Sequence, residues 1–357
     1  APERFWHGAN TSAADGNTDS LAFIDPDYEQ PSEWKYSLGA TYTMDNGLTL
    51  DGDIIYSRQN DPAYYEDVSQ TQIGTTAAGA PIFDFVAGSE NYMLTNANTY
   101  GDGLAVSLIA KQRYDWGLDW SLGYAYTDQT DVSPMTSSVA SSNFNNLALS
   151  SLVDPRAATS NYVSPHRFTA RISYAREFIP GHETRITAFM FSKEGQPQSH
   201  VMSSSDLEGD QRYGRHLLYV PSPNGDDNVV IQPGFDTAGW NTFLKTNGYE
   251  QYAGGFVPRN ARHTRWSNRM DLRIDQELPL FFGTQARAYL KIYNVLNMLN
   301  DSWGRQYDSY FYSQAVVTSS VDGDGRYVFE NFRNRGLTDL RENASLYEIR
   351  LGVQFEF

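Results

Sequence analysis

The chain has 357 residues, a formal net charge of −16 and a mean hydropathy of −0.53. No stretch of 18 consecutive apolar residues is present, which excludes a transmembrane helix, and the acidic balance disfavours nucleic-acid binding because phosphate contacts need a basic surface. The absence of cysteine excludes disulfide scaffolds, cysteine-ligated zinc and thiol catalysis.

Apolar and polar residues alternate over long stretches, which places the two kinds on opposite faces of a β-strand. In chain order the predicted strands are residues 34–44, 48–58, 104–113, 118–127, 167–178, 184–193, 269–275, 285–293 and 347–357. Strands of soluble proteins average about five or six residues, whereas a tilted strand needs roughly 9–11 residues to cross a bilayer. The lengths therefore favour a transmembrane β-barrel.

Short and long connections alternate between these strands. The short ones contain turn-forming residues: Asp45-Asn46-Gly47, Asp115-Trp116-Gly117, Ile179-Pro180-Gly181 and the stretch 279–283. The long ones are residues 59–103, 128–164, 194–265 and 296–343. In an up-and-down barrel this order puts every turn at the periplasmic rim and every long loop outside the cell.

The odd number of predicted strands indicates whether they make up a whole barrel. Counting back from the last strand, residues 1–33 form an external loop, and residues 34–357 form strands, turns and loops. A bacterial single-chain barrel has an even number of strands and both termini inside. The odd count therefore predicts earlier strands outside this sequence, unless the assignment has missed or added one strand.

A soluble β-sandwich also alternates apolar and polar residues. It requires neither long loops at one end only nor tryptophan and tyrosine near strand ends, where a membrane barrel carries aromatic girdles. Such residues are Trp34, Tyr42, Tyr56, Trp116, Trp120, Tyr126, Trp266 and Tyr293. The sequence therefore favours the membrane barrel.

The C-terminal part resembles TonB-dependent outer-membrane receptors. The motif Tyr293-Asn294-Val295-Leu296-Asn297 follows the penultimate predicted strand, and the last strand alternates up to a terminal phenylalanine, as in that family. Residues 299–304, together with the long loops, look like the Oar-like subgroup. The resemblance implies the C-terminal portion, about nine strands, of an all-β, antiparallel up-and-down transmembrane barrel of 22 strands.

The same resemblance implies function and partners. It implies TonB-dependent import of an unknown ligand, contact with outer-membrane lipid and lipopolysaccharide, and insertion by the barrel-assembly machinery. The signal for that machinery would be the apolar face of the last strand: Tyr347, Ile349, Leu351, Val353, Phe355 and Phe357. The family couples to TonB through a plug domain, and neither a plug nor a TonB box is recognised in these 357 residues.

Aromatic residues in the predicted external loops are candidate ligand contacts, because exposed rings stack on sugars, peptides or chelates. They are Tyr213, Trp240, Tyr249, Tyr252, Trp303, Tyr307, Tyr310 and Tyr312. The alternative is that they pack the loops against each other. Asp322 and Asp324, spaced on a glycine turn, are candidate calcium ligands, with a plain turn as the alternative. No other cofactor is predicted.

No catalytic constellation is found. The six histidines are scattered, and neither a Gly-x-Ser-x-Gly elbow nor a phosphate-binding glycine loop occurs, so the sequence predicts no enzyme. The leading hypothesis is a TonB-dependent receptor and transporter. Its rivals are a non-energised porin or surface adhesin, which would lack a plug, and a secreted β-rich binding protein, which would be soluble without detergent.

Overall fold

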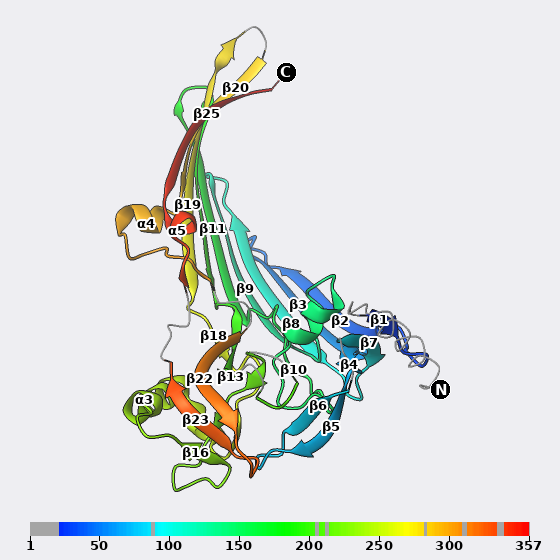
Figure 1. Cartoon of the computed structure of the whole chain (residues 1–357). Coiled ribbons are helices and arrows are strands. Elements are labelled where there is room, and N and C mark those ends of the chain that lie inside the picture. Colours follow the sequence, from blue (N-terminus) through cyan, green and yellow to red (C-terminus); the bar gives the residue numbers. More distant parts are fainter. Residues whose placement is uncertain are drawn as a thin grey trace.

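A computed structural model describes residues 21–86, 90–203, 207–210, 214–281, 284–308, 313–333 and 339–356. Long antiparallel strands dominate it (Figure 1). In spatial order they are β2 (Ser32–Thr43), β3 (Thr49–Asn60), β8 (Asp102–Arg113), β9 (Leu118–Asp131), β11 (His166–Ile179), β12 (His182–Lys193), β19 (Ser267–Phe281), β20 (Thr284–Tyr293) and β25 (Glu348–Glu356). The nine predicted strands are confirmed, and each pairs with its predecessor in the chain. A two-residue strand, β10 (Ala158–Thr159), adds to β9.

The strand β19 is longer than the alternation indicated. It continues to Phe281 through Pro279, whereas the alternation stops at residue 275 and the sequence predicted a turn over residues 279–283. That turn prediction was wrong at its start, because Pro279, Leu280 and Phe281 belong to the strand. Proline cannot donate a hydrogen bond to the ladder, and the pairing with β20 shifts between Leu278 and Phe281. This irregularity accommodates the proline, as β-bulges do.

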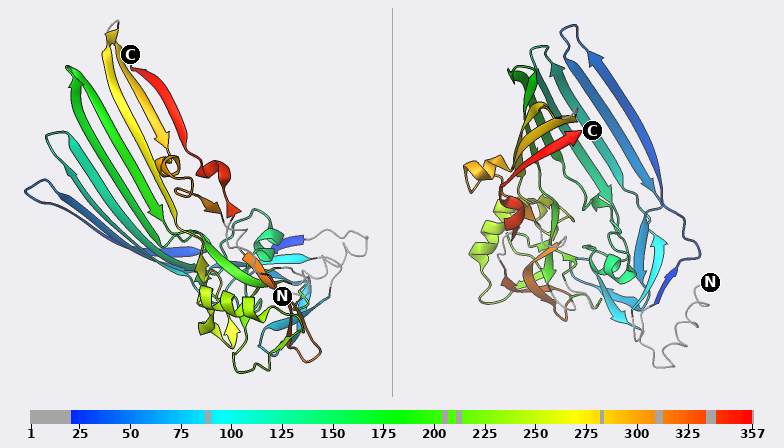
Figure 2. Two further views of the ribbon diagram at one scale, coloured as in Figure 1. Left: turned by 90° about the vertical axis from the view of Figure 1, so that its left-hand side faces the viewer. Right: turned by 90° about the horizontal axis from the view of Figure 1, so that it is seen from above.

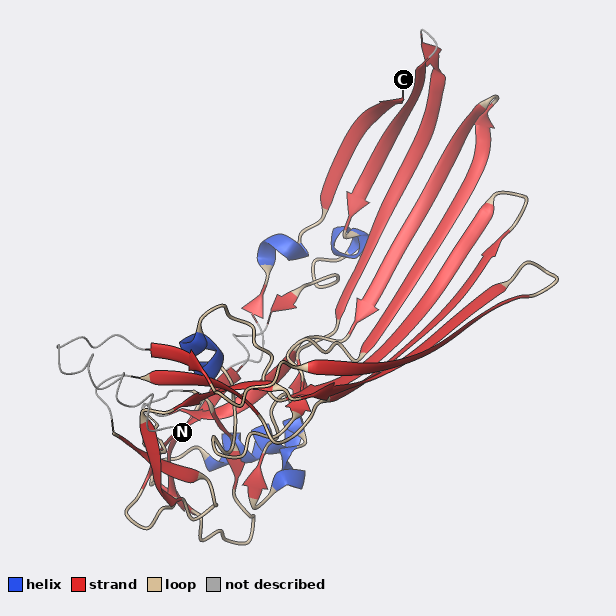
Figure 3. Cartoon of the chain, turned by 90° about the vertical axis from the view of Figure 1, so that its right-hand side faces the viewer, coloured by secondary structure: helices blue, strands red, loops and turns tan. Residues whose placement is uncertain are grey.

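The predicted alternation of short and long connections is confirmed. Gly47, Gly117 and Gly181 take positive φ angles of 85°, 100° and 76° in three of the turns. The turns lie at one end of the sheet and the long connections gather at the other (Figures 1 and 3). Among the described residues the curved sheet is open, because β2 pairs only with β3 and β25 only with β20.

The long connections fold into small elements of their own. One group comprises β1 (Leu21–Ile24), β4 (Ala63–Asp67), β5 (Gln70–Thr75), β6 (Pro81–Phe85), β7 (Asn91–Asn96) and α2 (Ala140–Asn145). A second comprises β13 (Pro197–Ser203), β14 (His216–Leu217), β15 (Tyr219–Val220), β16 (Val229–Ile231), α3 (Thr237–Asn247), η1 (Tyr249–Tyr252), β17 (Gly255–Phe256), β18 (Arg262–His263), β22 (Ser313–Val321) and β23 (Tyr327–Phe332). We call the two groups together the loop cap. The last long connection also contains α4 (Val295–Leu299), β21 (Tyr307–Asp308), β24 (Asp339–Leu340) and α5 (Glu342–Ser345), and α4 packs against β19.

The main hydrophobic clusters lie in the loop cap and not against the long strands. The larger one surrounds Trp240, Phe243 and Phe329, and the smaller one surrounds Tyr64 and Phe144. Views from two further directions show the loop cap at one end of the sheet (Figure 2). In the described part of the chain, no helix is long and apolar enough to cross a membrane.

Candidate functional site

One face of the long sheet is apolar across the strands. The pairing register aligns the apolar positions, so that Leu50, Ala110, Leu122, Ala170, Met190 and Met270 follow one another across six strands. Their larger side chains are open to the surroundings: Leu50 is 39% exposed, Leu122 is 50% exposed and Met190 is 40% exposed. Leaving a leucine in water instead of burying it costs about 1.5–3 kcal/mol, so this face needs an apolar cover.

Aromatic residues occur at both ends of the apolar face. At the loop end Tyr124 contacts Phe168 with ring centroids 4.9 Å apart, and Phe168 stacks on Trp266 at 6.2 Å. At the turn end Trp116 lies 5.9 Å from Tyr174. Tryptophan and tyrosine prefer the boundary between lipid and water, so two aromatic girdles fit this arrangement.

Tyr293, predicted with these aromatic residues, does not lie on the apolar face. Its register partner is Glu348, which puts its ring on the polar face between the guanidinium groups of Arg269 at 5.5 Å and Arg350 at 5.1 Å. The prediction was wrong for this residue because closeness to a strand end does not decide the face, whereas the residue's parity does.

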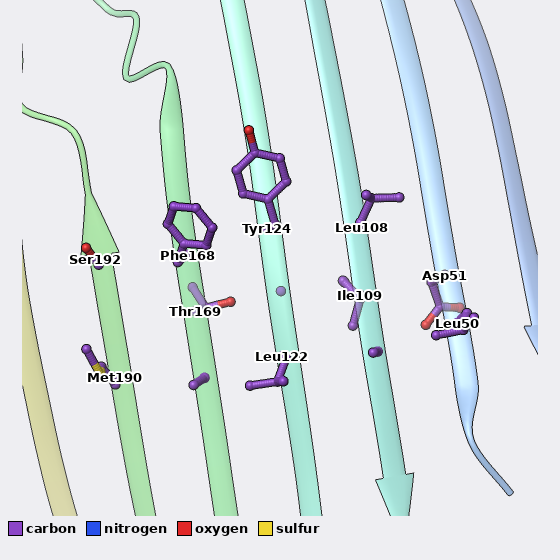
Figure 4. A pocket seen from close by; sticks show the side chains of 13 residues that line it. Leu50, Asp51, Leu108, Ile109, Leu122, Tyr124, Phe168, Thr169, Met190 and Ser192 are labelled. Carbon is purple, nitrogen blue, oxygen red and sulfur yellow. The ribbon is translucent and has the colours of Figure 1, made fainter. Parts of the chain in front are cut away.

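The apolar face contains a shallow hollow of about 530 Å³. Leu50, Leu108 and Leu122 line it together with Phe168 and Met190, from β3, β8, β9, β11 and β12 (Figure 4). Gly52, Ala110 and Ala170 lie at intervening positions on the same face. Small residues between large ones leave the hollow, and its size and apolar lining suit a hydrocarbon chain.

The opposite face carries charged residues in ion pairs. Arg273 pairs with Asp275 at 2.5 Å, Lys111 with Asp51 at 2.8 Å, and Arg171 with Asp119. Most of these side chains are partly exposed, as expected of a face in contact with water. A dry second layer would leave this many charges without solvation, so this face requires contact with water.

The last strand places its predicted assembly residues on the apolar face. Ile349, Leu351, Val353 and Phe355 face Ile292, Leu290, Ala288 and Ala286 of β20, in that order. Tyr347 precedes the strand and is 49% exposed, and Phe357 lies outside the described residues. The positions are as predicted, and their recognition by assembly machinery stays a prediction.

Two of the predicted ligand-contacting aromatics are buried in the loop cap. Trp240 is 3% exposed and Tyr249 is 1% exposed. Trp240 stacks on Phe243, and the Tyr249 hydroxyl hydrogen-bonds the Nδ1 of His200. These two rings therefore pack the loop, which is the alternative that the sequence left open, and they do not offer a surface to a ligand in this conformation. Tyr252 is partly buried against the same cluster.

The other predicted aromatics have different positions. Trp303 is 54% exposed beside α4, and Tyr307 is partly buried with the Arg265 guanidinium 5.2 Å from its ring centre. Tyr213, Tyr310 and Tyr312 lie outside the described residues. Of the described candidates, Trp303 keeps the most accessible ring.

The candidate calcium ligands lie in the turn between β22 and β23. The Asp322 carboxylate accepts hydrogen bonds from the backbone N–H groups of Asp324 and Arg326 and pairs with the Arg326 guanidinium at 2.8 Å. These contacts hold the pKa of Asp322 below its ordinary value. Among the described residues no group of three or more acidic, histidine or cysteine side chains is placed to hold a metal ion. Calcium binding here stays a prediction.

A buried arginine joins the two parts of the loop cap. Arg259, 3% exposed, donates to the carbonyl of Val132 at 2.7 Å, to the Asp131 carboxylate at 2.7 Å and to the Ala158 carbonyl at 3.2 Å. Its neighbour Asn260 donates to the Thr159 carbonyl at 2.7 Å. These bonds connect segments about a hundred or more residues apart, so the long connections form one folded body.

A buried charged cluster lies where the loop segments meet. His216 lies 3.2 Å from Glu208 and 3.3 Å from Asp210, and the Tyr327 hydroxyl donates to Glu208 at 2.7 Å. Burial alone would lower the pKa of His216, but the two carboxylates outweigh it and raise that pKa to about 9. The imidazole is therefore protonated at neutral pH and balances part of the buried negative charge.

A second cavity, the polar cavity, lies at the loop end of β2, β3, β8 and β9. It has a volume of about 380 Å³, and its lining is mostly polar. Glu33, Ser57, Gln59 and Gln129 contribute to it from polar-face positions, and Tyr162 contributes from the connection after β10. Its place, size and polarity make it a candidate site for a polar ligand.

No protein-family model and no curated protein matches this sequence. The function of this chain must therefore be inferred from the two faces of the sheet, the loop cap and the polar cavity. No sequence motif marks the cavity, because its residues come from five separate segments of the chain. Gly101 and Gly103, two glycines one residue apart at the start of β8, mark a place where neighbouring strands pack closely.

Proposed function

We propose that this chain forms part of the wall of a TonB-dependent transporter in the outer membrane of a Gram-negative bacterium. The observation that carries the proposal is the apolar face, which is continuous in register over the long strands and exposed, with all short turns at one end. Lipid is the cover that such a face needs, and lipopolysaccharide would contact its outer rim.

In this proposal the loop cap lies outside the cell and contacts an imported ligand. Its hydrophobic clusters and buried hydrogen bonds would present that ligand with a preformed surface. The edges β2 and β25 would pair with further strands to close a barrel of 22 strands, because unpaired backbone groups in hydrocarbon cost several kcal/mol each. Energy would come from the TonB complex through a plug domain, and the barrel-assembly machinery would insert the protein.

The membrane part of the proposal is tested with two neighbouring positions. Because the chain has no cysteine, Leu38→Cys and Ser37→Cys each create a single labelling site, on the apolar and the polar face of β2. With an environment-sensitive fluorophore in lipid vesicles, we expect a blue-shifted emission at position 38, quenched by brominated lipid, and a water-like emission at position 37. Water-like emission at both positions would show that lipid does not cover the apolar face.

A non-energised porin or adhesin is the second candidate, favoured by the same exposed apolar face. The transporter requires an inner-membrane energy source, so dissipating the proton-motive force in cells that make the full protein should stop accumulation of its ligand. Uptake that continues down a gradient, or surface attachment without uptake, would support the porin or the adhesin instead. A plug domain with a TonB box in the same protein would support the transporter.

A further inference from the structure

Two glycines lie at the loop end of β8, next to the polar cavity. Gly103 lies in register between Ser57 of β3 and Gln129 of β9. A Cβ atom at position 103 would lie 3.0 Å from the Ser57 hydroxyl and 3.4 Å from the Gln129 Cγ. Gly101, two residues earlier, lines the cavity, and its bare Cα lets the backbone of Thr130 approach closely. The two glycines thus allow the neighbouring strands to pack closely beside the cavity.

Two amide side chains in the cavity are free to bind. Gln59 and Gln129 make no side-chain hydrogen bond within the described residues, and both belong to the cavity lining. An amide offers a donor and an acceptor side by side. The pair therefore suits a ligand with neighbouring hydroxyl groups, each of which both donates and accepts.

The charges in the cavity disfavour an anionic ligand. Its lining contains Glu33, Asp102 and Asp131 but no lysine, arginine or histidine. Two of these carboxylates already have cationic partners, Glu33 with Lys35 at 2.9 Å and Asp131 with Arg259 at 2.7 Å. The remaining field is weakly negative, so phosphates and carboxylates are repelled and a strong cation gains little.

An aromatic ring completes the lining. Tyr162 is 68% exposed and reaches the cavity from the connection after β10. A ring that is open to solvent on a polar site can stack on the C–H face of a pyranose while the amides bind its hydroxyls. The volume of about 380 Å³ lies within the range of small-molecule sites.

We infer that the polar cavity binds a neutral oligosaccharide. The inference rests on the proposed function, which places this cavity on the aqueous side of the barrel wall at its outer rim. The amides of Gln59 and Gln129 recognise hydroxyl groups, Tyr162 stacks on a sugar ring, and the carboxylates exclude acidic sugars.

The experiment uses Ser133→Cys, a conservative change in the cavity lining of a chain without cysteine. The rate of alkylation of this thiol is measured with maltose, cellobiose and N,N′-diacetylchitobiose as neutral probes and maltobionate as the acidic one. We expect at least one neutral disaccharide to slow alkylation by about fivefold or more at saturation, and maltobionate to have no effect. Lack of protection by all three neutral sugars, or equal protection by maltobionate, would overturn the inference.

Side-chain variants in the same background test the residues. Each of Gln59→Leu and Gln129→Leu should lower the affinity for the protecting sugar about three- to tenfold, which corresponds to the loss of one hydrogen bond. Gln354→Leu is the matched control, since Gln354 lies on the same polar face of β25, outside the cavity lining. An unchanged alkylation rate without sugar checks that the variants keep their fold. Equal weakening by the control would also count against the site.

The outcomes separate this inference from the proposed function. The fluorophores at positions 37 and 38 report on lipid and not on the cavity. Correct insertion without sugar protection would overturn the inference and leave the membrane wall standing. Sugar protection without insertion would support a soluble sugar-binding β protein and overturn the transporter.

Discussion

At the scale of single residues, the buried polar groups of the loop cap matter more than its exposed ones. Arg259 and His216 lie in the interior with short contacts to carboxylates, whereas Arg156 pairs with Asp154 at the surface. Removing one partner of a buried charge pair leaves the other without solvation or a counter-charge. The same geometry at the surface is screened by water and contributes little.

Arg259→Ala should therefore destabilise the loop cap by about 3–5 kcal/mol, because it leaves the Asp131 carboxylate and the carbonyl groups of Asp131, Val132 and Ala158 without their donor. Hydrogen exchange of the cap amides measures the loss as faster local opening. Arg156→Ala, which removes a guanidinium that is 77% exposed, is the control and should change stability by less than about 1 kcal/mol. Similar exchange in both variants would contradict the anchoring role of Arg259.

The stability of the loop cap should also depend on pH through His216. Its pKa is about 9 in the folded chain against an ordinary value of 6.5. Below pH 6.5 both states hold the proton and the stabilisation is complete. Between pH 6.5 and 9 the unfolded chain has released it while the folded chain has not, so the stabilisation falls as the pH rises.

The urea midpoint of the cap, followed by tryptophan fluorescence, should accordingly drop between pH 6.5 and 9. His216→Gln should remove this alkaline drop and lower the midpoint at pH 6.5. His182→Gln, in the turn end of the sheet, should leave the pH dependence as it is. A wild-type midpoint that is flat over this range would show that the buried carboxylates do not hold the proton.

At the scale of elements, α3 shows why an aromatic loop residue need not be a binding residue. Asp236 caps the helix by accepting from the Gly239 N–H at 2.9 Å, and Gly248 ends it with a positive φ of 67°. Between these ends Trp240 packs into the larger hydrophobic cluster. The helix packs through its tryptophan, so the Trp240 ring is buried in the loop cap and is not exposed on its surface.

Trp240→Ala should cost the loop cap about 3–5 kcal/mol through the lost burial and the cavity left behind. Trp303→Ala removes a ring that is 54% exposed and should change stability by less than about 1 kcal/mol. Thermal unfolding of the two variants makes the comparison. A larger loss for Trp303→Ala would reverse the assignment of structural and accessible rings.

At the scale of the whole molecule, an added charge should impair membrane insertion on the apolar face of the sheet but not on the polar face. Leu351 and Gln354 lie on the apolar and the polar face of the same strand, β25. An arginine on a lipid-facing side costs about 2–4 kcal/mol near the middle of the bilayer, whereas on the lumen side it stays in water.

Leu351→Arg should therefore reduce folding into vesicles, seen as less heat-modifiable migration on gels and a lower free energy of unfolding in lipid. Gln354→Arg, the matched change on the other face, should fold like the unmodified chain. If both variants inserted equally well, a cover other than lipid would have to be sought for the apolar face.

The sequence by itself determined the long strands, their faces and the alternation of turns and loops. These features are local, because a period of two and a turn-forming glycine act within one strand or hairpin. Two weaker local rules failed: Pro279 lies inside β19 and not in a turn, and Tyr293 lies near a strand end but on the polar face, as the alternation itself requires.

The tertiary structure alone decided the loop cap and the polar cavity. Trp240 and Tyr249 are buried in the loop cap, and Arg259 binds Asp131, which lies 128 residues away in the sequence. Gln59 and Gln129 line the same cavity. Such contacts depend on which loops meet after the strands have paired. No periodicity within a segment carries that information, because burial and partnership are properties of neighbours that are distant in the sequence.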